Sequence, residues 1–281
     1  TAYEISLGLV GSEMCIRDSY LTVPPKRLFI YPYLKMHCAA ALGAAALFTA
    51  GGMGLEPEML LSIISGCEYA GTTTLANNIS AWVERSMGGQ MPTHDHWKIP
   101  ELSHRPHTRE ENEALLALSP ALRESFQRYH MDYHLQEDFY SGAHHVLVGF
   151  HIDEAVYAPH YYGYGGRDEY ADRAWSARHI EGRILQIAQD TVLVHLQATP
   201  AAIRARMEKE PREFGVVKDA DIEYILQRFE EEFRRSFLRQ KIQIDNTELT
   251  PEQTLASFVE QIQPHLSEAD RARILTRNLP A

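Results

Sequence analysis

The chain has 281 residues, of which 44% are hydrophobic and 23% are charged, and its formal net charge is −11. These values are typical of one globular domain with a sizeable core. The acidic balance argues against a nucleic-acid-binding surface, which needs an excess of Lys and Arg, so a small molecule is the expected partner. The three cysteines form no CxxC pair and no disulfide framework. That usage is typical of a reducing compartment and predicts a cytoplasmic protein.

The N-terminal segment differs in composition from the rest of the chain. Residues 1–19 resemble translated sequencing-adapter read-through, and residues 38–55 form an uncharged run rich in Ala and Gly. A signal segment or a membrane anchor is an alternative interpretation of that run. Ala and Gly are only weakly apolar, however, and a predicted strand follows within a few residues. We therefore expect a non-native or disordered extension over 1–58, a native start near Met53 or Met59, and no membrane attachment.

From residue 59 onward, short apolar runs alternate with longer helical patterns, which is the signature of βαβ units. Strands are predicted over 60–65, 91–97, 145–150, 191–197 and 241–244. Helices are predicted over 72–87, 109–118, 120–136, 170–188, 201–208, 219–236 and 251–266. The pattern predicts a three-layer α/β domain over 59–266, with a mostly parallel central sheet and helices on both faces. A C-terminal tail is expected over 267–281.

A degenerate phosphate-loop motif lies where the first strand turns into a helix. Gly66 and Gly71 have the spacing of G-x-x-x-x-G-K-[ST], in which backbone N–H groups surround a phosphate at a helix N-terminus. A hydroxyl at the position of Thr73 can ligate Mg²⁺. Thr72 stands where the motif has Lys, which removes a positive charge that stabilises phosphoryl transfer. An ordinary glycine-containing turn with a threonine-rich cap is the alternative interpretation. The predicted nucleotide-binding residues of the loop are Gly66, Cys67, Glu68, Tyr69, Ala70, Gly71, Thr72, Thr73 and Thr74.

Three later segments, together with the loop, resemble the thymidylate kinase and deoxynucleoside kinase group of P-loop kinases. Residues 148–165 are similar to the family's strand that ends in Asp-Arg and is followed by a Tyr-containing loop. Residues 194–206 resemble its strand, Thr-Pro turn and arginine-bearing helix, and a stretch resembling the cationic lid follows. Residues 241–262 resemble its last strand, Asn-Thr turn and closing helix. The resemblance implies a P-loop kinase-like fold, with ATP and Mg²⁺ as cofactors.

The resemblance also implies roles for individual residues. Arg206 and Arg212 are the expected lid cations, which could replace the missing loop lysine. Asn246 lies in the turn that often borders the adenine. On the acceptor side, Asp153 keeps the family's acid, whereas Glu154 stands where the arginine is expected. Tyr157 and Tyr162 could stack on a planar acceptor, although a packed Tyr/Gly loop explains them equally well.

Asp95 is the predicted catalytic base. It lies near the end of the second predicted strand and resembles the Asp-x-Phe/Tyr element of uridine-kinase-like enzymes, whose carboxylate orients or deprotonates the acceptor hydroxyl. His94 and His96 flank it, but neighbouring strand residues point to opposite faces and no third ligand is spaced to converge with them. The spacing therefore argues against a metal site built on these histidines.

The sequence thus favours an ATP- and Mg²⁺-dependent kinase acting on a small-molecule acceptor such as a nucleoside or a nucleotide. The alternative is a catalytically inactive nucleotide-binding protein, used as a sensor or an interaction module. Thr72 favours that alternative, whereas Asp95 and the cationic lid argue against it. A homodimer is compatible with the sequence.

Overall fold

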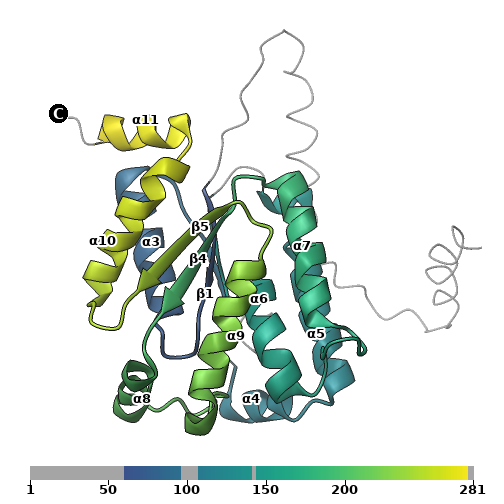
Figure 1. Ribbon diagram of the computed structural model, residues 1–281. Helices are drawn as coiled ribbons and strands as arrows, with labels where there is room; N and C mark the ends of the chain where they lie inside the picture. The colour runs from purple at the N-terminus through teal and green to yellow at the C-terminus, as the bar shows by residue number, and fades with distance from the viewer. Residues whose placement is uncertain (1–59, 96–106, 141–143, 278–281) are drawn as a thin grey trace, which may run out of the picture. The chain divides into compact units, whose positions relative to one another are not determined.

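The computed structural model describes residues 60–95, 107–140 and 144–277 (Figure 1). Within these residues a 5-stranded parallel sheet has the order β2-β3-β1-β4-β5. The strands are β1 (Leu61–Ser65), β2 (Thr93–Asp95), β3 (His145–Val148), β4 (Val192–Gln197) and β5 (Gln240–Asp245). From β1 the chain passes first to β2 and β3, which lie on one side of β1, and later to β4 and β5, which lie on the other side. The sheet therefore has a topological switch point beside β1, where ligands of open α/β sheets bind at the carboxyl ends of the strands.

Strand β1 forms the middle of the core. Ile63 is fully buried and pairs in register with Leu147 of β3 and Leu193 of β4. Both neighbours are fully buried too. Runs of this kind, apolar on both faces, are typical of central parallel strands covered by helices on each side.

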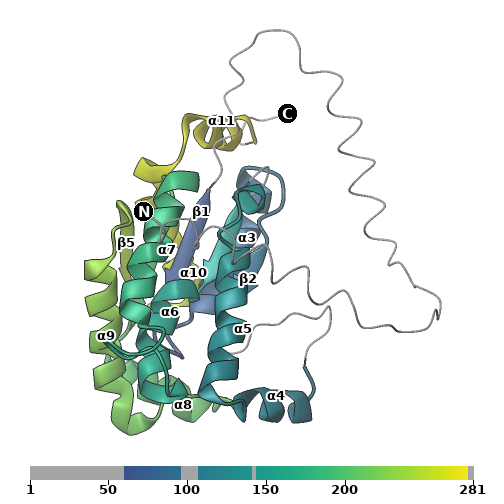
Figure 2. The same ribbon diagram turned by 90° about the vertical axis from the view of Figure 1, so that its right-hand side faces the viewer.

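Helices cover both faces of the sheet (Figure 1). On one face, α3 (Thr72–Ser86) contacts α10 (Pro251–Ile262) and α11 (Glu268–Arg277). Trp82 of α3 packs edge-on against Phe258 of α10, with ring centroids 6.2 Å apart. The other face, which Figure 2 views directly, carries α5 (Pro120–Tyr133), α6 (Phe150–Tyr157), α7 (Arg173–Ile187) and α9 (Ile222–Arg235). Shorter helices α4 (Arg109–Leu116) and α8 (Pro200–Lys209) complete the described set.

The predicted α/β fold class, a parallel sheet with helices on both faces, is confirmed. The segment expected as a C-terminal tail contains α11, whose Asp270 is buried. Of the second predicted strand, the end beyond Asp95 lies outside the described residues, as do the whole predicted extension and most of the loop predicted over 100–108. No helix in the described part of the chain has the length and apolar character needed to cross a membrane.

One boundary prediction is wrong in a way that affects the site. The third strand was predicted to continue to residue 150, with Asp153 and Glu154 close to its end, but β3 stops at Val148. Gly149 has a φ of 78°, a conformation that only glycine adopts easily, and it lets helix α6 begin at once with Phe150. Asp153 and Glu154 therefore lie within a helix rather than at a strand end.

Candidate functional site

The phosphate loop connects β1 to α3, and its two motif glycines are both required by the geometry. A Cβ atom on Gly66 would stand 2.9 Å from the carbonyl oxygen of Leu196, in the neighbouring strand β4. Gly71 precedes the first residue of α3 with a φ of 91°, in the left-handed region. The backbone thus takes a path here that other residues would obstruct.

The first turn of α3 presents N–H groups that have no acceptor among the described residues. The first N–H groups of any helix lack partners within the helix, and Gly71 supplies no side-chain cap. In the part of the chain that the structure describes, the N–H groups of Thr72, Thr73 and Thr74 donate to no other group. The turn also contains no acidic residue. An uncapped N-terminus with its helix dipole and three adjacent hydroxyls suits a phosphate.

Two cavities adjoin this turn. The larger, of about 580 Å³, includes residues from β2, β3, α6 and the segment after α8: Gly66, Glu68, Thr72, Thr73, Thr74, Asp95, Val148, Asp153, Tyr157, Arg212, Glu213 and Phe214. The smaller, of about 280 Å³, includes residues from α8, from α10 and from the turn before it: Tyr69, Ala70, Gly71, Thr74, Leu75, Arg206, Lys209, Glu210, Arg212, Asn246, Leu249, Pro251 and Thr254. Thr74 and Arg212 line both, so a ligand that crosses the helix N-terminus could occupy both cavities.

Asp95 and Thr73 meet at the mouth of the larger cavity. The Thr73 hydroxyl donates a hydrogen bond of 3.1 Å to Asp95 Oδ2, and both side chains are exposed. Asp95 is the last residue of β2 and lies beside Val148 at the carboxyl end of β3. Strand alternation sends the preceding His94 to the opposite side, against His134 and Phe139. The structure therefore brings together the residue predicted as base and the residue predicted as Mg²⁺ ligand.

Asp153 contributes a second carboxyl group to the same cavity. It accepts a hydrogen bond from the Gly66 N–H, while its Oδ1 atom is buried and has no hydrogen-bond partner in the described residues. Burial is the main reason that the pKa of Asp153 lies well above its usual range, and the nearby acidic group of Asp95 raises it further. A buried, unpartnered oxygen beside a cavity is available to a ligand.

The segment 210–218, which together with Lys209 makes up the stretch that resembles the lid, contacts the phosphate loop. The backbone N–H of Arg212 donates to the Tyr69 hydroxyl at 3.0 Å, and the Arg212 guanidinium lies over the Tyr69 ring, 4.9 Å from its centroid. The Glu68 carboxylate accepts the N–H groups of Val216 and Val217, each at 2.9 Å. The cation predicted for the lid is thus held beside the loop that lacks a lysine.

Arg206 and Asn246 bind the loop's backbone. Arg206 donates to the carbonyl oxygen of Tyr69 at 3.2 Å and to that of Asn246 at 2.7 Å. Asn246 in turn donates from Nδ2 to the carbonyl oxygen of Ala70 at 2.7 Å. Burial lowers the pKa of Arg206. Both residues line the smaller cavity, but their observed bonds join the turn between β5 and α10 to the loop. Lys209, which the resemblance to the lid also includes, lies three residues after Arg206 on α8 and lines the same cavity.

Tyr157 is buried against the loop, and Cys67 is a buried residue of the loop itself. The Tyr157 hydroxyl accepts the Glu68 N–H at 2.9 Å, and its side chain borders the larger cavity. Cys67 is fully buried, and burial raises the pKa of its thiol, so it is a packing residue rather than a nucleophile.

Glu154 and Tyr162 line neither cavity. Glu154 accepts hydrogen bonds from Arg173 Nε at 3.1 Å and from the Tyr164 hydroxyl at 2.9 Å. Successive residues of a helix point about 100° apart, so Asp153 and Glu154 cannot both face the loop. Tyr162 is buried with the Arg123 guanidinium 4.8 Å from its ring centroid. The resemblance placed these two residues at the substrate, whereas the structure packs them elsewhere.

The oxygen atoms at the loop fit Mg²⁺. Across the described residues, no group of three or more His, Cys, Asp or Glu side chains is arranged to hold a metal ion. The Thr73 hydroxyl and the carboxyl groups of Asp95 and Asp153 nevertheless form an all-oxygen set beside the anion-binding turn. Mg²⁺ is commonly held by one or two carboxylates together with substrate phosphate oxygens and water.

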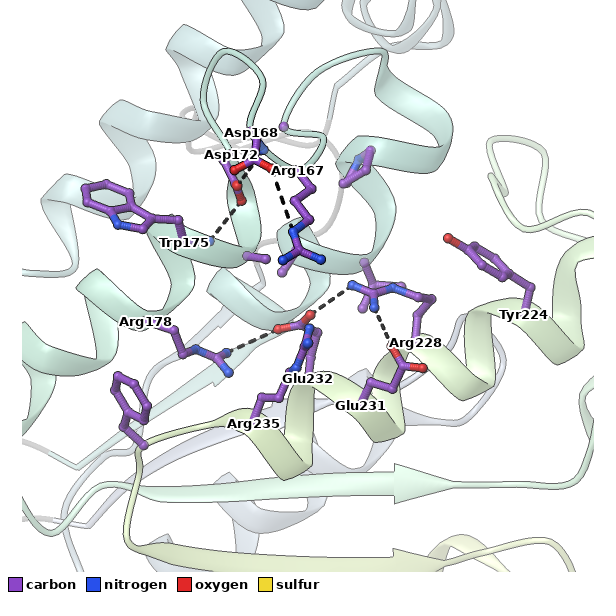
Figure 3. A pocket seen from close by; sticks show the side chains of 16 residues that line it. Arg167, Asp168, Asp172, Trp175, Arg178, Tyr224, Arg228, Glu231, Glu232 and Arg235 are labelled. Atoms are coloured by element: carbon purple, nitrogen blue, oxygen red, sulfur yellow. Dashed lines mark hydrogen bonds and ion pairs between the residues drawn. The ribbon is translucent and has the colours of Figure 1, made fainter.

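A still larger cavity, of about 720 Å³, includes residues from α6, α7 and α9 (Figure 3). Arg178 and Arg228 point toward Glu232 from two sides, at 3.3 and 2.9 Å, and Arg228 also pairs with Glu231. We call this the outer cleft. Each of these charges has an opposite charge beside it.

No protein-family model matches the chain, and no curated protein matches it. Solved structures similar to it include the YorR protein of Bacillus subtilis in complex with phosphorylated GDP, at 18% identity over 74% of this chain and 99% of that chain, with a TM-score of 0.44. Deoxyadenosine kinase from M. mycoides with bound dATP is 13% identical over 73% and 99% of the two chains, with a TM-score of 0.46. Thymidylate kinase from Candida albicans is 14% identical over 74% and 94%, with a TM-score of 0.48. At these values the similarity carries no inference about activity or substrate.

Proposed function

We propose that the protein is an ATP- and Mg²⁺-dependent phosphotransferase that acts on a small molecule carrying a hydroxyl or a phosphate, and that nucleosides and nucleotides are the first acceptors to test. One observation supports this most. The uncapped N-terminal turn of α3 shares a single cavity with several carboxyl groups, among them those of Asp95 and Asp153. A phosphate held at the turn would therefore lie beside groups able to bind and deprotonate an acceptor.

We assign a residue to each step of the proposed reaction. The N–H groups of Thr72 to Thr74 would hold the phosphates, and the Thr73 hydroxyl would ligate Mg²⁺, which when bound neutralises charge on the phosphate oxygens. Asp153 would hydrogen-bond the acceptor. As the acceptor oxygen forms its bond to the γ-phosphorus, its proton passes to Asp95, the bond to the β–γ bridging oxygen breaks, and ADP leaves. Asp95 suits this role because it contacts Thr73 directly.

Arg212 is the proposed substitute for the motif lysine. It lines both cavities, and Arg–phosphate contacts can supply the same electrostatic stabilisation on a transferring phosphoryl group. The second candidate function is nucleotide binding without transfer, which Thr72 favours. A pure binder, however, has no need for a carboxylate beside the phosphate-binding turn.

The test is ADP formation from Mg-ATP in the presence of nucleosides, nucleotides and sugars, with ATP binding followed in parallel by calorimetry. We expect ATP binding together with acceptor-dependent ADP formation for at least one class of acceptor. Binding with no turnover across all acceptors would favour the binding-only function. Absence of ATP binding would contradict both functions.

A further inference from the structure

The lid is held over the phosphate loop by two side chains of that loop. After α8 ends, residues 210–218 contain no helix or strand, apart from a turn in which the Gly215 N–H donates to the Arg212 carbonyl at 3.2 Å. A segment of this kind has no hydrogen-bond ladder of its own to keep it in place. The contacts that hold residues 210–218 in place must therefore come from neighbouring segments.

Glu68 provides the first attachment. Its Oε2 atom accepts the backbone N–H groups of Val216 and Val217, both at 2.9 Å, and the side chain is buried. Hydrogen bonds from two donors to one carboxylate oxygen are charge-assisted and are stronger than neutral ones. A carboxylate without hydrogen-bond donors would repel a phosphate bound at this loop. The two N–H groups of the lid bind the Glu68 carboxylate, which explains why an acidic residue is tolerated at this position.

Tyr69 provides the second attachment. Its backbone lies in the left-handed region with a φ of 67°, which is rare for an aromatic residue and persists only where the surroundings impose it. The conformation accompanies two contacts with the lid. The Tyr69 hydroxyl accepts the Arg212 N–H at 3.0 Å, and the ring lies beneath the Arg212 guanidinium. The lid turn packs closely on the same hydroxyl, since a Cβ atom on Gly215 would stand 3.3 Å from it.

We propose that Glu68 and Tyr69 are positioning residues that hold the lid closed and set the Arg212 guanidinium at the junction of the two cavities. In the phosphate-loop motif the corresponding positive charge belongs to the loop itself. Here the loop carries Thr72 and instead orients a cation from the lid. The purpose assigned to that cation rests on the proposed phosphotransferase function, whereas the attachment of the lid does not.

The attachment can be tested without any ligand, by limited trypsin digestion with mass-spectrometric identification of cuts after Arg212 and Lys218. Glu68→Ala and Tyr69→Phe should each speed these cuts roughly 10-fold, because each removes hydrogen bonds that close the segment. Glu68→Gln keeps a neutral acceptor and should restore most of the protection. Tyr164→Phe is the matched control, because its hydroxyl bonds Glu154 rather than the lid. Equal cutting of wild type, Glu68→Ala and Tyr69→Phe would overturn the attachment.

The positioning role has a kinetic test, made with Mg-ATP and the acceptor found active in the ADP assay. Tyr69→Phe and Glu68→Ala should lower kcat roughly 10-fold while the KM for ATP changes less than about 2-fold, and Glu68→Gln should recover much of kcat. Faster lid cutting with unchanged kcat would overturn the positioning of Arg212. If wild type neither binds nor turns over ATP, the proposed function and this use of Arg212 both fail, and the digestion alone still decides whether the loop holds the lid.

Discussion

The outer cleft and the phosphate-loop cavity both gather charged residues, but they differ in how those charges are compensated. In the outer cleft Glu232 is only 1% exposed and has arginines on two sides, within 3.3 Å (Figure 3). In the loop cavity Asp153 Oδ1 has no hydrogen-bond partner among the described residues, and the α3 turn presents N–H groups without acceptors. The outer cleft is nevertheless the larger, at about 720 against about 580 Å³. Buried atoms of Arg178 and Glu232 in the outer cleft also lack hydrogen bonds, but each of these residues lies beside an opposite charge. Among the described residues, the feature that distinguishes the loop cavity is therefore a buried carboxyl group without a paired cation, rather than cavity volume.

The largest effect is expected at Asp95. Asp95→Asn keeps the shape of the side chain and a hydrogen bond to Thr73, but it removes the proton acceptor. We expect phosphoryl transfer to fall by about 10²- to 10⁴-fold while ATP affinity stays within about 2-fold, measured as kcat for ADP formation and as Kd by calorimetry. Asp168→Asn, at the rim of the outer cleft, is the control and should change neither quantity. Equal loss of transfer in both variants would contradict the difference between the two cavities.

Glu232 should matter for stability and not for nucleotide binding. Glu232→Ala leaves Arg178 and Arg228 without their shared carboxylate, and breaking a largely buried ion pair costs about 3 kcal/mol of unfolding free energy. Urea denaturation measures this loss, and calorimetry should give an unchanged ATP affinity. The matched control is Glu231→Ala on the same helix, which removes a more exposed partner of Arg228 and should cost much less. Lost ATP affinity with unchanged stability would identify the outer cleft as a ligand site instead.

The histidines packed on one side of strand β2 should make the fold sensitive to acid. Burial lowers the pKa of His94 to about 4, that of His130 to about 4 and that of His134 to about 3, from an ordinary value of 6.5. Because these histidines bind protons more weakly in the folded state than in the unfolded state, their contribution to stability is fully present above about pH 6.5 and is lost as the pH drops toward 4. Urea midpoints measured across this range should decline, and His94→Phe should make the decline shallower. A flat profile would contradict the buried, uncharged state of these histidines.

Much of the fold could be predicted from local patterns. The apolar runs of β1, β3 and β4 and the helical spacing of Leu75, Ile79 and Val83 in α3 are set by periods of two and 3.6 residues. The glycine spacing of the phosphate loop is likewise local. The prediction for Asp95 is also local, because it depends on the position near a strand end and on the resemblance to an Asp-x-Phe/Tyr element.

The remainder of the site depends on contacts between residues far apart in sequence. Glu154 looked like a substrate residue because it follows Asp153, but its partner Arg173 belongs to the next long helix. Helix α6 begins at Phe150 because Gly149 adopts a positive φ, and the spacing of apolar residues in the sequence does not indicate that conformation. The bonds from Glu68 to the lid span 148 and 149 residues, so the loop sequence alone gives no signal of them.

The smallest effect is expected at Asp153, where removal of the acidic group should raise the stability of the fold rather than lower it. Because burial raises the pKa of Asp153, its contribution to stability is present at low pH and is lost as the pH rises through the raised value. Asp153→Asn should therefore increase the unfolding free energy at pH 7 by about 1 kcal/mol while it slows transfer, a trade-off typical of ligand-binding residues. Glu181→Gln is the contrasting variant. Glu181 is also buried, but its hydrogen bonds with His151 and with the Phe237 N–H outweigh burial and lower its pKa, so its neutralisation should decrease stability. Urea denaturation of both variants decides the matter: two changes of the same sign would mean that Asp153 is as well compensated as the charges of the outer cleft.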